Sequence, residues 1–218
     1  MKEAFPLLST LSALVVFSSA ALAGAGATPD RTFIDAQTTA PVTARQLQLP
    51  LGTTEIYSTF NTDLDNAYDC CGGWTVSAVG SILGFRQDVA MPFTPAADGE
   101  VRAIHAAVGW VTGTNGVAIS LNADAGGMPG AAIKKGSVTG LPTFGTCCVT
   151  ASIIGGAPVT AGTQYWVVVR TNKQSADTWD AWNYNNIGLA GTFAFNTGTG
   201  WQLSSSSLSA FNVVGRAP

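Results

Sequence analysis

Short runs of β-branched and aromatic residues, separated by Gly, Asn and Pro turns, recur from about residue 53 to the end of this 218-residue chain. The clearest run, Tyr165 to Thr171 (YWVVVRT), follows the turn dipeptide Ala161-Gly162. A continuous apolar run of this length is typical of a strand that is buried on both faces. No segment after the first 23 residues shows a helical period of about 3.6 residues. We therefore predict an all-β fold: a two-sheet antiparallel β-sandwich of jelly-roll type with about ten strands.

One turn signal predicts a specific strand pairing. The dipeptide Asn115-Gly116 lies between two apolar runs, residues 100–111 and 117–121. Both residues tolerate a positive φ, which the tight turns of β-hairpins require. We therefore expect the two runs to pair as a hairpin.

The first 23 residues have the pattern of an export signal peptide. Lys2 gives a positive start, residues 5–22 are apolar, and Ala21-Leu22-Ala23 is a small-x-small cleavage site. We expect cleavage after Ala23; the alternative is a retained membrane anchor. Cleavage there predicts a secreted, extracellular protein.

The remaining chain divides into two parts. Residues 24–52 show no sustained period and predict a flexible linker or N-terminal arm. Within it, residues 45–51 alternate leucine with polar residues, as a strand added to a sheet edge would. Residues 53–218 are expected to form the β-sandwich domain.

Composition narrows the class of partner. Charged residues are only 11% of the chain, against roughly 25% in average domains, and the net charge is −3. The ten basic residues are scattered along the sequence, so it predicts no nucleic-acid partner and, after signal removal, no membrane partner. An extracellular polysaccharide or another surface protein is the expected partner.

A series of short motifs occurs in a fixed order between residues 57 and 215. The motifs are Tyr57-Ser58-x-Phe60, Gly73-Trp74-Thr75-Val76, Pro92-Phe93-Thr94-Pro95, Ser120-Leu121-Asn122, Gly126-Gly127-Met128-Pro129-Gly130, Gly140-Leu141-Pro142, Gly162-Thr163-Gln164-Tyr165-Trp166 and Asp177-Thr178-Trp179. In this order they resemble the choice-of-anchor R domain family of exported bacterial proteins. The resemblance implies a secreted or surface-displayed domain, and it supplies no catalytic residue.

Four cysteines form two adjacent pairs, Cys70-Cys71 and Cys147-Cys148. In an exported protein they predict disulfides, and a bridge between neighbours is disfavoured because their Cα atoms are only about 3.8 Å apart. We therefore expect bridges between the two pairs, with either connectivity. A four-thiolate zinc site and a redox switch are the alternatives.

Three aspartates between strands suggest a metal site. Asp63, Asp65 and Asp69 place oxygen ligands in one polar loop, as a calcium site does, although the loop lacks the central Gly and distant Glu of an EF-hand. Ordinary turn chemistry is the alternative, because Asp and Asn side chains bond to their own backbone. We expect no cofactor other than this calcium.

The most aromatic stretch of the chain has the composition of a sugar-binding face. Flat rings stack on sugars, and carboxylates bond to sugar hydroxyls. The candidate ligand-binding residues are Trp179, Trp182, Tyr184, Asp177 and Asp180. On a regular strand Trp182 and Tyr184 share one side and Trp179 lies on the other, so only part of the group can form a platform. Burial of these rings in the core is the alternative.

Nothing in the sequence predicts catalysis. His105, the only histidine, has no visible Ser or Asp partner, and Glu55 and Glu100 form no paired-carboxylate motif. There is no nucleophile elbow, phosphate loop or histidine metal cluster. We therefore predict a non-catalytic, extracellular structural or adhesive module, with a carbohydrate-binding module around Trp182 and Tyr184 as the alternative.

Overall fold

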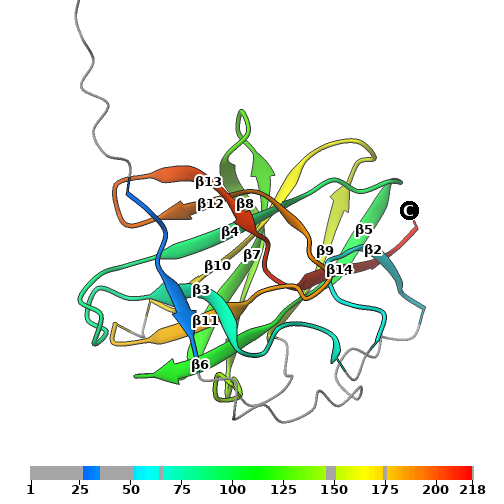
Figure 1. Ribbon diagram of the computed structural model, residues 1–218. Coiled ribbons are helices and arrows are strands. Elements are labelled where there is room, and N and C mark those ends of the chain that lie inside the picture. Colours follow the sequence, from blue (N-terminus) through cyan, green and yellow to red (C-terminus); the bar gives the residue numbers. More distant parts are fainter. Residues whose placement is uncertain (1–26, 35–51, 64–65, 146–150, 174–175, 218) are drawn as a thin grey trace, which may run out of the picture.

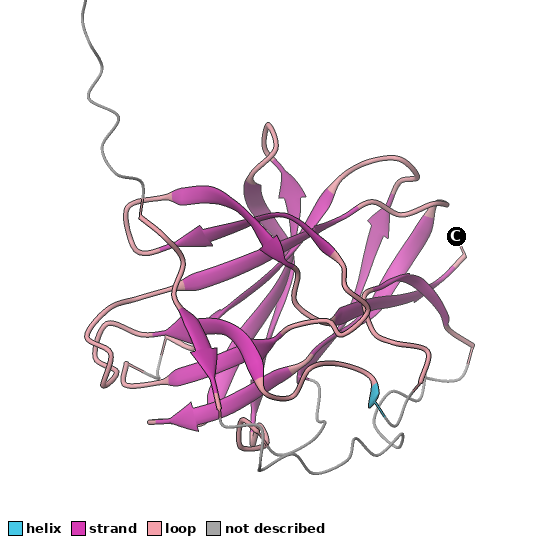
Figure 2. Ribbon diagram, in the orientation of Figure 1, coloured by secondary structure: helices cyan, strands magenta, loops and turns pink. Residues whose placement is uncertain are grey.

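The computed structural model describes residues 27–34, 52–63, 66–145, 151–173 and 176–217. Within these ranges the fold is all-β, with fourteen strands that pair with one another in antiparallel fashion and no α-helix (Figures 1 and 2). The short helical segment drawn in Figure 2 is a 3-10 turn at residue 66. The all-β class is confirmed, but there are more strands than the roughly ten expected and three sheets in place of two. The predicted signal peptide lies outside the described residues, and no described helix is long and apolar enough to cross a membrane.

The strands form one sheet of six and two sheets of four. The six-stranded sheet has the order β13 (Trp201–Ser207), β12 (Ala190–Asn196), β4 (Asp88–Phe93), β10 (Tyr165–Thr171), β7 (Gly116–Asp124) and β8 (Pro129–Thr139). One four-stranded sheet has the order β1 (Arg31–Phe33), β3 (Gly72–Ser77), β11 (Trp179–Asn183) and β6 (Val108–Thr112). The other has the order β2 (Thr54–Ser58), β14 (Phe211–Arg216), β5 (Gly99–Ala106) and β9 (Ala151–Val159).

The two four-stranded sheets meet through the backbone. Asn183 N donates to Ala107 O, Ala107 N donates to Ala210 O, and Ala210 N donates to Asn183 O. The main hydrophobic core includes side chains of all three sheets, among them Val167 of β10 and Phe211 of β14. The architecture is therefore sandwich-like: the six-stranded sheet packs against the two smaller sheets.

β10 has the environment that its sequence predicts. It pairs with β4 on one side and β7 on the other. Val167 and Val169 lie in the main core, whereas Trp166 and Val168 belong to a small cluster on the opposite face of the sheet. All four side chains are almost completely buried, so the strand is covered on both faces.

The predicted hairpin at Asn115-Gly116 is wrong. The run 100–111 is divided near Ala107 into β5 and β6, which belong to different sheets, and β7 belongs to the third. Asn115 instead fixes the loop by its side chain, because its Oδ1 accepts from Leu141 N and its Nδ2 donates to Leu141 O, each at 2.7 Å. The chain crosses between layers at this turn.

Part of the predicted flexible arm is a strand. Residues 31–33 pair with β3 as β1, and Thr32 Oγ1 lies 2.7 Å from Thr75 Oγ1. The Arg31 guanidinium lies 4.7 Å from the ring centre of Trp74, and its Nη2 donates to Ser206 Oγ of β13. β1 therefore links one small sheet to the edge of the six-stranded sheet. The other predicted edge strand, residues 45–51, lies outside the described residues.

Candidate functional site

The aromatic rings predicted as a sugar platform lie in the core. Trp182 of β11 is completely buried, and its Nε1 donates to Ala210 O at 2.9 Å. Tyr184 is 7% exposed and meets Trp74 edge-on, with 5.5 Å between the ring centres. The two side chains share one side of the strand, as expected, but this side faces the core. Neither ring presents a face on which a sugar could stack, so the platform prediction is corrected to core packing.

The other three residues of that prediction do not form one surface. Asp180 is fully buried, and burial raises the pKa of its carboxyl to about 8. Asp177 is exposed and accepts a hydrogen bond from Thr114 N. Trp179 is partly exposed, but its indole N–H is buried without a partner among the described residues. The five candidates therefore lie in different environments.

Cys70 and Cys71 are thiols with 3.5 Å between their sulfur atoms, and they are not joined by a disulfide. Burial, followed by the hydrogen bond with Cys71, raises the pKa of Cys70 to about 11. A thiol with such a pKa is almost entirely protonated at neutral pH and is a poor nucleophile and metal ligand. Cys147 and Cys148 lie outside the described residues, so bridges between the two pairs stay a prediction.

The loop of predicted calcium ligands is described in part. Asp65 lies outside the described residues. Asp63 N donates to Asn61 Oδ1, and the Asp69 carboxylate accepts from Cys71 N at 2.9 Å. These are turn interactions, and the described residues contain no group of three His, Cys, Asp or Glu side chains placed to hold a metal. Calcium binding stays a prediction.

His105 bonds to an amide. It lies on β5, almost buried, with its Nδ1 2.8 Å from Asn212 Oδ1. Burial is the main cause that lowers its pKa, so the imidazole is neutral at pH 7. Asn212 Nδ2 in turn lies 3.5 Å from Glu55 Oε2. This arrangement fixes the orientation of the ring.

A trough that the sequence does not predict lies on the outer face of the six-stranded sheet. Its volume is about 440 Å³, and its floor is β7 between β10 and β8. In register, Ala118 lies between Arg170 and Ser137, and Ser120 lies between Val168 and Lys135. Each of these two small side chains has one long neighbour, Arg170 or Lys135, and the middle strand leaves a hollow between the two long side chains. We call this site the β7–β10 trough; it is lined by Ala118, Ser120, Ala132, Lys135, Gly136, Ser137, Arg170, Thr171, Asn172 and Lys173.

Polar groups of the trough are held by hydrogen bonds. Ser120 Oγ donates to Asn122 Oδ1 at 2.7 Å, and Ser137 Oγ donates to Asn172 Oδ1 at 3.0 Å. Asn122 is fixed in turn, because its Nδ2 donates to Gly130 O. The lining includes three cationic side chains and no carboxylate. The trough can therefore bind polar or anionic groups on a scaffold that is already formed.

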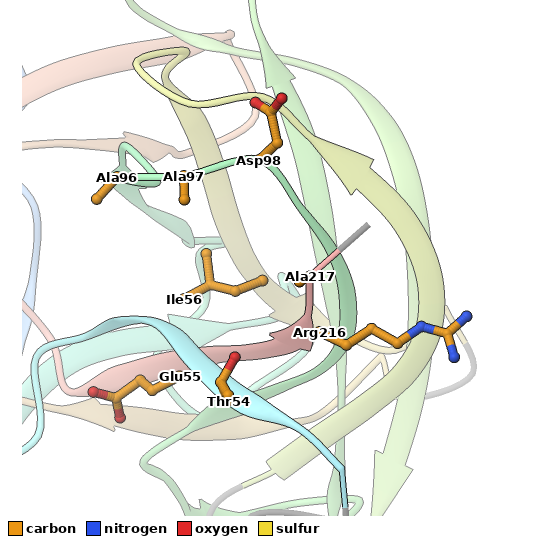
Figure 3. A pocket seen from close by; sticks show the side chains of 8 residues that line it. All are labelled: Thr54, Glu55, Ile56, Ala96, Ala97, Asp98, Arg216 and Ala217. Atoms are coloured by element: carbon orange, nitrogen blue, oxygen red, sulfur yellow. The ribbon is translucent and has the colours of Figure 1, made fainter.

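A second, smaller pocket lies where β2, β14 and the loop before β5 meet (Figure 3). Its volume is about 210 Å³. Ile56 projects into it, and Glu55 and Asp98 lie at its border with Arg216, which pairs with Glu100 at 2.9 Å. Because its charges have both signs and its arginine is already paired, this pocket is the weaker candidate.

Comparison with models of known protein families finds none that matches this sequence, and comparison with curated proteins also finds no match. The likeness to choice-of-anchor R domains therefore stays a prediction.

Proposed function

We propose that this chain is an exported, extracellular β-sandwich module that acts by adhesion or as a structural component and does not catalyse a reaction. Export follows from the predicted signal peptide, and the jelly-roll strand order and the choice-of-anchor R likeness are part of the same proposal. The β7–β10 trough is the surface through which we propose that the module adheres.

The chemistry of the trough lining carries this proposal. Both of its serine hydroxyl protons are donated to amide oxygens, those of Asn122 and Asn172. An amide oxygen does not accept a proton at neutral pH, so neither serine is activated as a nucleophile. Among the described residues that line the trough there is no histidine, carboxylate or thiol to act as an acid or base. The site therefore has groups that can bind a ligand, but no nucleophile with a neighbouring base that could react with it.

The low charge of the chain supports the same role. Only 11% of the residues are charged, and a polar uncharged surface suits a protein outside the cell. With Trp182 and Tyr184 in the core, carbohydrate binding, if it is the means of adhesion, is assigned to the trough and not to these rings.

The experiment asks whether the protein binds extracellular polymers without degrading them. The full chain is expressed in an exporting bacterium, and the secreted product is mixed with bacterial cell walls and with insoluble polysaccharides. We expect the protein to appear outside the cell, to sediment with at least one of these materials and to release no soluble sugar. Release of reducing ends or peptide fragments would contradict the non-catalytic role, and retention of the product inside the cell would contradict export.

A further inference from the structure

We infer that the β7–β10 trough binds the carboxylate groups of an acidic polysaccharide, such as a polyuronate. This inference names the ligand class of the proposed adhesive site and rests on that proposal. It depends on where the cations of the protein are, how the trough is shaped and what surrounds the cations.

The cations of the described residues are divided between paired and unpaired positions. Arg86 pairs with Asp88, and both Arg102 and Arg216 pair with Glu100. Arg31 lies over the Trp74 ring. The other described cations are Lys134, Lys135, Arg170 and Lys173, for which no ion-pair partner occurs among the described residues; all but Lys134 line the trough. In a chain of net charge −3, three of these four unpaired positive charges collect at one hollow.

An uncompensated group of cations favours an anionic ligand. Arg170 and Lys135 rise from β10 and β8, whose backbones are about 10 Å apart with β7 between them. An arginine guanidinium binds a carboxylate through two parallel hydrogen bonds, and a lysine adds a point charge. The two cations therefore flank the hollow and can each meet an acidic group of one ligand.

The size and the neutral groups of the trough favour a sugar acid over a small inorganic anion. A volume of about 440 Å³ is within the range of roughly 300 to 1,000 Å³ for small-molecule sites, far larger than one sulfate needs. The Asn172 amide, oriented by Ser137, offers a partner for ligand hydroxyls. No aromatic ring lines the trough, so ring stacking contributes nothing and the acidic groups must supply recognition.

The experiment compares one polymer with and without its charge. Secreted protein is run in native gels that contain polygalacturonate or the same polymer with its carboxylates methyl-esterified. We expect at least tenfold stronger retention by the charged polymer, weakening as salt rises from about 50 to 500 mM because salt screens exposed charges. Equal retention by both polymers, or retention that salt does not change, would overturn the inference.

Variants test whether the trough is responsible. Arg170→Ala and Lys135→Ala should each weaken retention by polygalacturonate at least fivefold without changing the melting temperature. Lys134→Ala is the matched control: it removes the same charge one residue away, but Lys134 pairs with Leu121 and lies beside Gly155 of β9. An equal loss in Lys134→Ala, or no loss in Arg170→Ala, would refute a specific site and indicate nonspecific attraction.

Two further experiments are needed. One distinguishes a carboxylated sugar from other anions, and the other distinguishes failure of this inference from failure of the proposed adhesive role. If dextran sulfate or inorganic phosphate competes as well as polygalacturonate at equal charge concentration, the assignment to a carboxylated sugar is wrong. If the protein sediments with cell walls or neutral polysaccharides but ignores polygalacturonate, the ligand class fails and the adhesive role stands. If it binds none of these materials, both fail.

Discussion

β11 and the β7–β10 trough both carry polar side chains, but in opposite environments. Along β11 and the turn after it, polar atoms are enclosed without partners among the described residues: Trp179 Nε1, both Asp180 carboxylate oxygens, Asn183 Oδ1, Tyr184 OH and Asn186 Oδ1. In the trough, the serine hydroxyls have partners and the cations reach solvent. A buried polar group without a hydrogen bond costs about 1 to 3 kcal/mol, whereas a solvated one remains available to a ligand.

This contrast shows why composition alone points to the wrong strand. Tryptophan, tyrosine and aspartate together suggest a ligand site, but the same rings are also the largest contributors to a sandwich core. Whether such a strand is a ligand site or part of the core depends on whether another sheet covers it. β11 lies between β3 and β6 and faces the six-stranded sheet through Trp182, whereas the trough lies on the outer face of that sheet.

The strongest way to test this contrast is to remove the central ring of β11. Trp182→Ala deletes a fully buried side chain that contacts Phe211, with ring centres 6.0 Å apart, and bonds to Ala210 O. We expect the free energy of unfolding to fall by about 3 to 5 kcal/mol. Urea denaturation measures it. A loss below 1 kcal/mol would mean that Trp182 is not a core residue and would reopen the platform interpretation.

The second prediction concerns the buried carboxyl of β11. Burial raises the pKa of Asp180 to about 8, above the value of about 3.9 in an unfolded chain. The folded protein then binds more protons than the unfolded chain between pH 4 and 8, so stability falls as pH rises through this window and levels off above it.

Asp180→Asn removes this titration with little change in shape. We expect the variant to match the parent near pH 4 and to be more stable by about 4 kcal/mol at pH 7. Thermal unfolding across this pH range checks the result. Asp177→Asn, on the exposed residue nearby, is the control and should leave the pH profile unchanged in this window. Parallel profiles for parent and Asp180→Asn would show that Asp180 is solvated.

A smaller effect is expected at β1, the edge strand of the sheet that contains β11. Arg31→Ala removes the guanidinium above Trp74 and its bond to Ser206. Cation–π contacts at partly exposed sites contribute about 0.5 to 1 kcal/mol, and we expect a loss of this size. Arg31→Lys keeps the charge and should recover part of it. A neutral outcome for Arg31→Ala would show that strand pairing alone holds β1.

The smallest stability effect is expected in the trough. Arg170→Ala and Lys135→Ala remove side chains without ion-pair partners among the described residues, and we expect changes within about 0.5 kcal/mol. Chemical denaturation measures this directly. If either variant were more stable than the parent, the unpaired cations of the trough would be shown to repel one another in the absence of a ligand. The trough would then differ from β11 even more clearly.

Local sequence patterns predicted the fold class correctly, but they did not predict the candidate site. The run of β10 identified a strand covered on both faces, and the absence of helical period identified the class. The hairpin at Asn115-Gly116 failed because a run that looks continuous changes sheets near Ala107, and no local pattern marks such a crossing. The trough was missed because Ser120, Lys135 and Arg170 become neighbours only through strand register. Small polar residues alternating with core residues along β7 were the one signal available.

The position of β14 has a consequence for how this protein comes to be folded. The strand is formed by residues 211–216, near the end of the sequence, yet it lies between β2 and β5 and joins them (Figure 1). Ribosomes release the N-terminal part of a chain first, so β2 and β5 emerge long before the strand that connects them. Pairings between such distant segments also form slowly. The sheet that holds β14 therefore closes only after residues 211–216 have been made, because this strand pairs with both β2 and β5.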